Sequence, residues 1–451
     1  MGASAQRRIA QGIAAGAFGQ GVSIVTQIVM VPLLLRYWGA ESYADWLAIS
    51  TIAAYLGLSD VGMSSAGGNR MAMLVARDDH EGVNRVFQSL VALLSVSSLA
   101  VMVVCLALAF GADMPRLLNL HTLNRPQAAT LVMLLGLHVV VGLFDGVTFG
   151  IYRASHLFPR AIVGHNLMRC LELAVWCVCV PLGGDMTTLA VATLVVRFAG
   201  VGCIYRDALL RAPFLSIGIS AATVAEIRAL VKPSFAFLCV PIGNALRVQA
   251  VTMLGRRFLT TNDFLAFTTV RTLVNSIFTA VTVVNGSFWP ELTRALAVKD
   301  LPVARRLHRT AVGMSAAVVV GLGGVLVVAG PWILKVWTND TVTYDPSVYA
   351  IQLAAILVFS LWQTSSVVSV SINDFAAIAI GYVASAGLAL AAGWWLAWVF
   401  GACGLAASAL VVDAIMIWTV VPRSLWLTGD SLRLLCSDGA RTLRMAAGGR
   451  V

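Results

Sequence analysis

The chain has 451 residues, of which 59% are hydrophobic and only 12% are charged, and its formal net charge is +10. Soluble globular proteins carry about 25% charged residues, so this composition excludes a soluble globular protein and indicates a polytopic membrane protein. The sequence contains no P-loop, no nucleophile elbow and no HExxH motif, and its eight cysteines show no metal-ligand spacing. We therefore expect no enzymatic activity, no cofactor and no bound metal.

Apolar runs follow one another along almost the whole chain. A membrane-spanning helix needs about 20 apolar residues, and about twelve runs reach this length, near residues 12–35, 43–66, 87–110, 128–150, 161–182, 188–205, 232–254, 264–289, 310–331, 348–371, 375–399 and 402–421. The first run continues past Pro32, which is too long for a signal-peptide core, so we expect an uncleaved first helix. The prediction is an all-α polytopic membrane protein with about twelve transmembrane helices.

A more polar region after Tyr205 separates six of the runs from the other six. It contains "ISAATVAEIRALVKP", which has the pattern of a short amphipathic helix. The predicted division is an N-terminal six-helix lobe at 1–211, a cytoplasmic linker with the amphipathic helix at 212–231, a C-terminal six-helix lobe at 232–422 and a cytoplasmic tail at 423–451.

The basic residues are distributed unevenly between the two sides of the membrane. If both termini lie inside, most of the 31 lysines and arginines fall in inner segments. Under the positive-inside rule this bias predicts cytoplasmic termini and a cytoplasmic loop at 290–309. The basic balance therefore indicates orientation in the membrane, and we expect no nucleic-acid partner.

The eighth run carries a polar stripe along its whole length. Its members are separated by 3, 4, 7, 3 and 4 positions, which places them on one helical face; they are Thr268, Arg271, Asn275, Thr282, Asn285 and Trp289. Apolar residues such as Val270, Ile277 and Val281 lie on other faces. Because lipid cannot solvate such a stripe, we expect it to face a water-filled cavity or polar neighbours.

Three further runs contain arginines, at Arg169, Arg197 and Arg247. A charged side chain at the bilayer centre costs about 2.5–3.5 kcal/mol, so all four intramembrane arginines must be paired or directed into water. Arg169 has Glu172 one helical turn away, which predicts an ion pair between them. Arg247 and Arg271 have no acid within one turn, which leaves two interpretations, substrate contact or a salt bridge to another helix.

Four acids lie within the apolar runs: Asp60, Asp145, Glu172 and Asp413. Each is a candidate either for proton or cation coupling or for a partner of an arginine. We favour the arginine-partner interpretation. His138 and Asp145 lie seven positions apart on the fourth run, which is a weak signal for a proton relay.

Several segments resemble those of bacterial polysaccharide repeat-unit flippases, a family of the multidrug/oligosaccharidyl-lipid/polysaccharide transporter superfamily. They are "VPLLLRYWGAESYADWLAIS", "YLGLSDVGMSSAGGNRMA", "FTTVRTLVNSIF" leading into "NGSFWPEL", and "GACGLAASALVVDAIMIW". The resemblance implies two six-helix lobes around a central cavity. It also implies alternating-access movement of undecaprenyl-diphosphate-linked oligosaccharide across a bacterial inner membrane, driven by a proton or sodium gradient.

The resemblance also suggests which residues meet the substrate. The cationic cavity positions of the family correspond here to Arg271 and Arg247, with Arg169 and Arg197 as further candidates. Arginine offers bidentate hydrogen bonds to phosphate, and neutral polar side chains suit sugar hydroxyls; the candidates are Asn275, Asn285, Asn244, Gln20 and Gln27. The expected partners are a polyprenyl-diphosphate-linked oligosaccharide, membrane lipid, and a polymerase with other polysaccharide-assembly proteins.

Three other functions compete with this one. A multidrug or organic-cation antiporter of the same superfamily should place carboxylates in the cavity of its first lobe, and the first run has none. A lipid II flippase should have a thirteenth and a fourteenth span, which the sequence does not show. A membrane polysaccharide polymerase should carry a long outer loop, yet the longest outer segments, near 111–127 and 332–347, are short.

Overall fold

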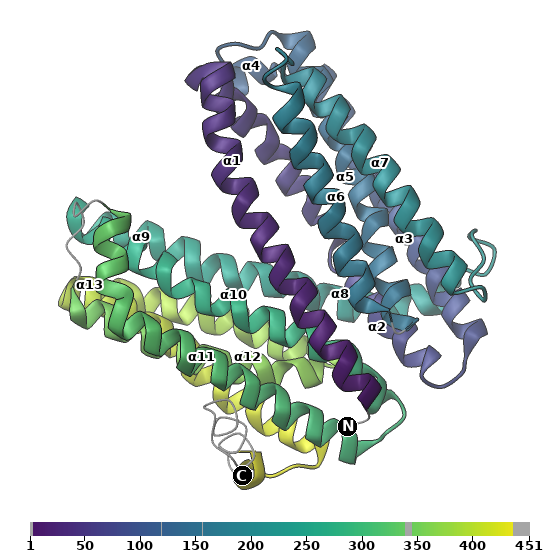
Figure 1. The fold of residues 1–451 in the computed structure, drawn as a ribbon, viewed down its shortest axis with the longest axis vertical. Coiled ribbons are helices and arrows are strands. Elements are labelled where there is room, and N and C mark those ends of the chain that lie inside the picture. The colour runs from purple at the N-terminus through teal and green to yellow at the C-terminus, as the bar shows by residue number, and fades with distance from the viewer. Residues whose placement is uncertain (1–2, 119, 156, 339–344, 436–451) are drawn as a thin grey trace. The chain divides into compact units, whose positions relative to one another are not determined.

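The computed structural model of the protein describes residues 3–118, 120–155, 157–338 and 345–435, and within these ranges all regular elements are helices (Figure 1). In chain order they are α1 (Ala3–Leu56), η1 (Gly57–Asp60), α2 (Met63–Val75), α3 (His80–Gly111), α4 (Met114–Leu117), α5 (Arg125–Ala154), α6 (Phe158–Cys179), α7 (Met186–Arg211), α8 (Val224–Ala245), η2 (Leu246–Ala250), α9 (Val251–Phe258), α10 (Thr261–Ala297), α11 (Leu301–Trp337), α12 (Pro346–Ser371) and α13 (Ala376–Thr428). η1 is a 3₁₀ turn and η2 is a π-helical turn.

In the described part of the chain, 11 helical segments are long and apolar enough to cross a membrane. One of them, α13, has 53 residues and a break in helical geometry at Gly401, whose φ of 56° favours glycine. An unbroken helix of that length would extend about 80 Å, whereas the hydrocarbon core is about 30 Å thick. The two sides of Gly401 therefore form separate spans. The prediction of an all-α polytopic protein with about twelve spans is confirmed.

The chain forms two compact units. The N-terminal unit is Ala14–Ser234, and the C-terminal unit is Met1–Ile13 together with Phe235–Val451. The segment expected to be a separate amphipathic helix instead forms the first turns of α8, which begins at Val224 and continues into the seventh span. The twelfth span also continues beyond Pro422, where we expected the tail to start, and ends at Thr428.

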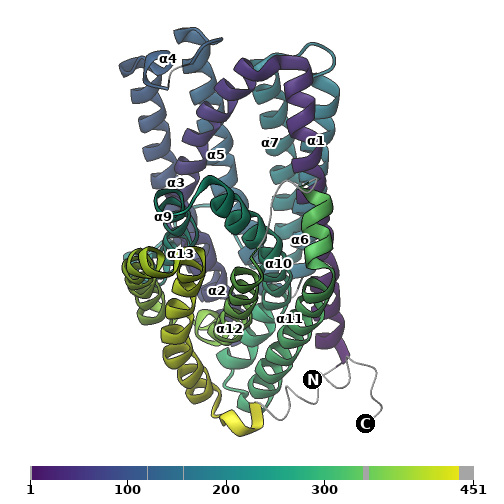
Figure 2. The same ribbon diagram turned by 90° about the vertical axis from the view of Figure 1, so that its left-hand side faces the viewer.

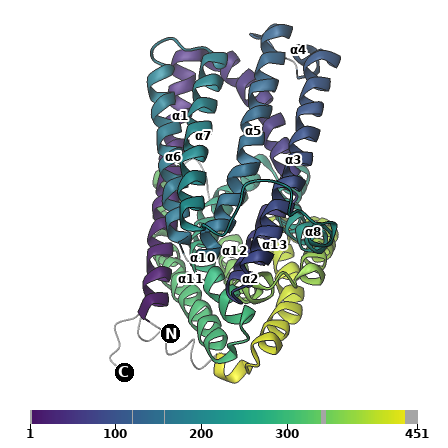
Figure 3. The same ribbon diagram turned by 90° about the vertical axis from the view of Figure 1, so that its right-hand side faces the viewer.

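Within the N-terminal unit, α5 is the central helix and packs against α2, α3 and α7, while α6 lies along α7 (Figures 1 and 3). Small residues bring α2 and α5 close together, because a Cβ atom on Gly68 would lie only 2.9 Å from the Cα atom of Gly150. Phe87 and Leu90 of α3 and Ile151 of α5 are fully buried beside this crossing. Helix α5 is thereby held in place, and it carries Asp145.

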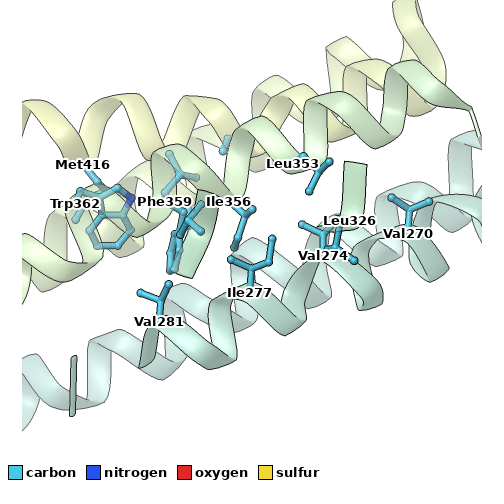
Figure 4. Packing of buried hydrophobic residues seen from close by; sticks show 14 of the residues in the cluster. Val270, Val274, Ile277, Val281, Leu326, Leu353, Ile356, Phe359, Trp362 and Met416 are labelled. Carbon is cyan, nitrogen blue, oxygen red and sulfur yellow. The ribbon is translucent and has the colours of Figure 1, made fainter. Parts of the chain in front are cut away.

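Within the C-terminal unit, α10, α11, α12 and α13 pack along one another (Figure 2). The core between α10 and α12 is visible in Figure 4, where Val274, Ile277 and Val281 of α10 point toward Ile356 and Phe359 of α12. These valines and isoleucines recur every three or four positions and are almost completely buried. The apolar face of α10 therefore makes the core and leaves its polar stripe to other neighbours.

The first turns of α1 pack within the C-terminal unit. Arg8 donates two hydrogen bonds to the carboxylate of Glu291 on α10, at 2.7 and 2.9 Å. Glu291 also accepts from Arg294 at 3.0 Å. Ile9 is buried against Phe288 and Leu292 in the same region. The beginning of α1 is thus attached to α10 by both an ion pair and apolar packing.

Candidate functional site

The N-terminal unit contains a cavity of about 470 Å³, which we call the N-terminal cavity. Its lining includes the ionisable side chains of Asp60, His138, Arg153 and Arg197. Four residues from η1, α5 and α7 thus bring acidic and basic groups to one space. Arginine and carboxylate groups at membrane depth are costly unless they are paired or reach water, so such a cavity is a candidate functional site.

Asp60 stands at the end of η1, where the chain turns into α2. Gly62 adopts a left-handed conformation with φ 74°, which glycine tolerates without steric cost. The Asp60 carboxylate accepts hydrogen bonds from the Ser64 backbone N–H at 3.1 Å and the Ser64 hydroxyl at 2.6 Å. The turn therefore holds Asp60 at the cavity wall through neutral donors.

Arg197 of α7 lies between two carboxylates on two other helices, hydrogen-bonded to one and within ion-pair distance of the other. Its Nη1 donates to Glu172 Oε1 of α6 at 3.2 Å, and its Nη2 lies 3.7 Å from Asp145 Oδ2 of α5. We predicted that Glu172 would pair with Arg169, and that prediction is wrong. The Glu172 side chain is directed toward α7, whereas Arg169 is exposed and its Nη1 lies 3.5 Å from the Ser23 hydroxyl of α1.

Asp145 also contacts His165 of α6, a residue that sequence reasoning did not select as functional. His165 Nε2 lies 2.6 Å from Asp145 Oδ1, and His165 Nδ1 lies 2.6 Å from the carbonyl oxygen of Ala161. The imidazole stacks on Phe149 with the ring centroids 3.9 Å apart. A histidine inside an apolar run, sharing a helical face with Glu172, was the signal that could have identified it.

The C-terminal unit has its own cavity of about 200 Å³, the C-terminal cavity. Arg247, Arg271 and Asn275 line it, together with Gln352 and apolar side chains that include Phe267. The structure thus brings three of the predicted substrate-binding residues to one space. Two arginines and two amides make its polar lining donor-rich.

Arg247 lies in the π-helical turn η2 and forms a salt bridge with Asp413 of α13. Its Nη2 lies 2.9 Å from Asp413 Oδ2, and Trp362 Nε1 donates to the other carboxylate oxygen at 3.0 Å. The guanidinium also lies over the ring of Phe359, 4.3 Å from its centroid. Asp413 therefore has the arginine partner that we favoured for the intramembrane acids.

Arg271 of α10 forms no salt bridge with any residue in the described ranges. Its Nη2 donates to the Thr252 hydroxyl at 2.6 Å and its Nη1 to the carbonyl oxygen of Val248 at 3.2 Å. That carbonyl belongs to η2, where π-helical geometry interrupts the regular α-helical hydrogen-bond pattern. The charge of Arg271 is solvated by neutral acceptors and by the face of Phe267, 5.4 Å away.

The remaining predicted binding residues lie apart from the two cavities. Asn244 accepts a hydrogen bond from the Tyr382 hydroxyl at 2.8 Å, and Asn285 donates to Gln363 of α12. Trp289 stacks on Phe237. The stripe on α10 thus faces a cavity at Arg271 and polar neighbours further along.

In the first span, Gln20 is not among the residues that line either cavity. The side chain of Gln27 lies outside the described part of the structure. Among the described residues, no group of three or more His, Cys, Asp or Glu side chains is arranged to hold a metal ion.

No protein-family model matches the sequence, and no curated protein sequence does. Solved structures do match the fold. A point mutant of a MATE transporter superposes with a TM-score of 0.77 at 13% sequence identity, over 97% of this chain and 97% of that chain. An outward-facing multidrug resistance MATE family transporter of the MOP superfamily gives a TM-score of 0.70 at 13% identity, over 96% of each chain.

A third similar structure is a MOP superfamily transporter from Pyrococcus furiosus, with a TM-score of 0.72 at 12% identity over 94% of this chain and 95% of that chain. That protein is described as having a binding pocket of reverse polarity, which suggests a different function for it. At these identities the likeness establishes the fold. The chain is a multi-pass membrane protein with the fold of MATE transporters of the MOP superfamily, and these similar structures are transporters.

Proposed function

We propose that the protein is an alternating-access transporter of a bacterial inner membrane, which exports amphiphilic organic compounds in exchange for a cation. The N-terminal cavity is the observation that carries this proposal. Asp60 lines it directly, and Asp145 and Glu172 bind Arg197 in its wall. Carboxylates at membrane depth are the groups that bind coupling protons or cations in transporters.

This proposal revises our order of preference from the sequence. We ranked the antiporter second because the first span has no carboxylate. Three intramembrane carboxylates of the N-terminal unit lie on η1, α5 and α6 instead: Asp60 lines the N-terminal cavity, and Asp145 and Glu172 contact Arg197, which also lines it. The multidrug resistance MATE family transporter among the similar structures supports the same choice, because it shares the fold over almost the whole chain.

A second candidate function is the flipping of a polyprenyl-diphosphate-linked oligosaccharide, with cytoplasmic termini and with polysaccharide-assembly proteins as partners. Arg271 favours it, since it is a cation in the C-terminal cavity that pairs with no carboxylate in the described ranges. A guanidinium in such a setting can form charge-assisted hydrogen bonds to a phosphate group. Asn275 and Gln352 beside it suit neutral polar groups.

Deletion of the gene in its own bacterium distinguishes the two candidates. The antiporter proposal predicts increased sensitivity to cationic dyes such as ethidium, slower ethidium efflux and an unchanged surface glycan. The flippase candidate predicts normal efflux, loss of the surface glycan and accumulation of lipid-linked repeat units at the cytoplasmic face. A deletion strain with normal efflux and normal dye sensitivity would refute the antiporter proposal.

A further inference from the structure

The His165–Asp145 pair in the N-terminal unit has a hydrogen-bond geometry that requires a proton. His165 Nδ1 lies 2.6 Å from the Ala161 carbonyl oxygen, which can only accept, so Nδ1 must carry a hydrogen. His165 Nε2 lies 2.6 Å from Asp145 Oδ1. An ionised carboxylate also only accepts, and two facing lone pairs at this distance would repel each other. One proton therefore lies between Nε2 and Oδ1.

No neighbouring hydroxyl can take the place of that proton. Thr148 is close, with its hydroxyl oxygen 3.4 Å from His165 Nε2. However, the Thr148 hydroxyl donates its only hydrogen to the backbone carbonyl oxygen of Asp145 at 2.7 Å. The pair therefore exists either as an imidazolium with a carboxylate or as an imidazole with a carboxylic acid, and both forms contain the same shared proton.

The surroundings of the pair provide an alternative partner for Asp145 once this proton leaves. Its second oxygen, Oδ2, lies 3.7 Å from Arg197 Nη2, which is beyond hydrogen-bond distance but within ion-pair distance. The buried Nε of Arg197 has no hydrogen-bond partner in the described structure. Arg197 thus has donors available for a carboxylate that moves only a short way. Full ionisation of Asp145 would strengthen its attraction to this guanidinium.

The charged and titratable groups in and beside the N-terminal cavity lie on η1, α5, α6 and α7, whereas α2 contributes only Ser64 and Ser65 to its lining. The groups around His165 are Asp145, His138 and Arg153 on α5, Glu172 on α6, Arg197 on α7 and Asp60 on η1. With the shared proton in place, the charges of the His165–Asp145 pair cancel, and those of Arg197 and Glu172 cancel. Loss of the proton leaves one net negative charge next to the cavity.

We infer that the His165–Asp145 pair is the binding site for the coupling cation, and that this cation is a proton. On proton release, Asp145 Oδ1 leaves His165 Nε2 and the carboxylate turns to Arg197. His165 keeps the hydrogen on Nδ1 and its bond to Ala161, and Nε2 becomes an empty acceptor. The coupling role of this proton rests on the proposed antiport function. The shared proton itself follows from the hydrogen-bond geometry of His165 and Asp145.

Spectroscopy of the full chain in lipid nanodiscs tests the shared proton directly. Nitrogen-15 NMR of labelled histidines, compared with His165→Gln, assigns the His165 signals, and infrared difference spectra with Asp145→Asn assign the Asp145 carboxyl. We expect the acidified wild type to show either a second N–H on His165 or the acid carbonyl band of Asp145, and this signal to disappear when the shared proton is removed by base. His80→Gln removes an exposed histidine and should leave these signals unchanged. The absence of both signals at the acid end would overturn the inference.

Transport by reconstituted vesicles tests the coupling, with ethidium as the probe and the membrane potential clamped at zero. With a gradient of about one pH unit, a one-for-one exchange can sustain about a tenfold concentration ratio. We expect the wild type to approach that ratio, and His165→Gln and Asp145→Asn to equilibrate ethidium without accumulating it. Full accumulation by His165→Gln would overturn the inference. Failure of the wild type to transport ethidium, with the shared proton present in the spectra, would instead refute the proposed function.

Discussion

Arg247 and Asp413 form a salt bridge inside the C-terminal unit, with 2.9 Å between Nη2 and Oδ2 and with the Asp413 side chain fully buried. Asp413 binds Trp362 through its other oxygen, and Arg247 lies over Phe359. The pair connects the turn η2 to α13. The Arg247 guanidinium stays charged at every physiological pH. Among the described residues, the Asp413 carboxylate is the only group that compensates this charge.

Removing one partner of this pair should destabilise the protein. Asp413→Asn leaves the Arg247 charge uncompensated in a buried setting, which costs about 3–5 kcal/mol. We expect a lower unfolding temperature in nanodiscs and less protein in the membrane. The double variant Arg247→Gln/Asp413→Asn should recover most of the loss, because no single charge remains. A stable and abundant Asp413→Asn variant without transport would instead identify Asp413 as an ion-coupling residue.

Arg271 should respond differently, because its partners are neutral. Arg271→Ala removes hydrogen bonds to Thr252 and Val248, each worth about 0.5–1.5 kcal/mol, and leaves no buried carboxylate unpaired. Protein abundance should therefore remain near normal. If the C-terminal cavity binds an anionic group, the variant should fail to restore the surface glycan of a deletion strain.

Two further variants separate charge from shape at this position. Arg271→Lys should restore part of the glycan, because lysine keeps the charge but loses the planar fork. Asn275→Ala should have a milder effect, since it removes one neutral group. Full complementation by a well-expressed Arg271→Ala protein would eliminate Arg271 as an anion-binding residue.

The number and type of the spans could be predicted from sequence because hydropathy over about 20 residues directly reflects the thickness of the bilayer. The cavity residues Arg271 and Asn275 could be predicted because residues four apart share a helical face. Both signals are local to a single helix. They need no knowledge of which helices are neighbours.

The ion pairs could not be predicted in the same way. Arg169 and Glu172 satisfy the local rule, yet Glu172 binds Arg197 of the next helix. The partner of Arg247 lies 166 positions away, so helix packing alone determines the pair. His165 was missed for the same reason, because its partner Asp145 is on another helix. A rule based on spacing within a helix does not reach such contacts.

Cysteine labelling tests the predicted topology. In a protein whose native cysteines have been replaced, Leu182→Cys lies in the exposed turn between α6 and α7, and Val298→Cys lies in the exposed turn after α10. The positive-inside rule places the first turn outside and the second in the cytoplasm. A membrane-impermeant maleimide added to intact cells should label position 182 and miss position 298 until the membrane is permeabilised. The opposite pattern would invert the orientation.

The acid stability of the protein should depend on Asp430, which follows the end of α13. Arg309 of α11 donates to its two carboxylate oxygens at 2.8 and 2.5 Å, and the Ser431 N–H donates at 2.7 Å. Burial acts to raise the pKa of Asp430, but the hydrogen bonds from Arg309 and Ser431 and the charge of Arg309 together hold this pKa below the usual 3.8.

A carboxyl whose pKa is lower in the folded state stabilises the fold above its unfolded pKa, and this contribution disappears as the pH falls through the folded pKa. At neutral pH, Asp430→Asn should therefore unfold at a lower temperature than the wild type, since charged hydrogen bonds of this kind contribute about 1.5–3 kcal/mol. Between about pH 5 and about pH 2 the difference between the two proteins should shrink toward zero. Other carboxyl groups titrate in both proteins and cancel in the comparison. Thermal unfolding across this pH series measures the difference, and a constant gap down to the lowest pH would show that the Arg309–Asp430 pair does not titrate as argued.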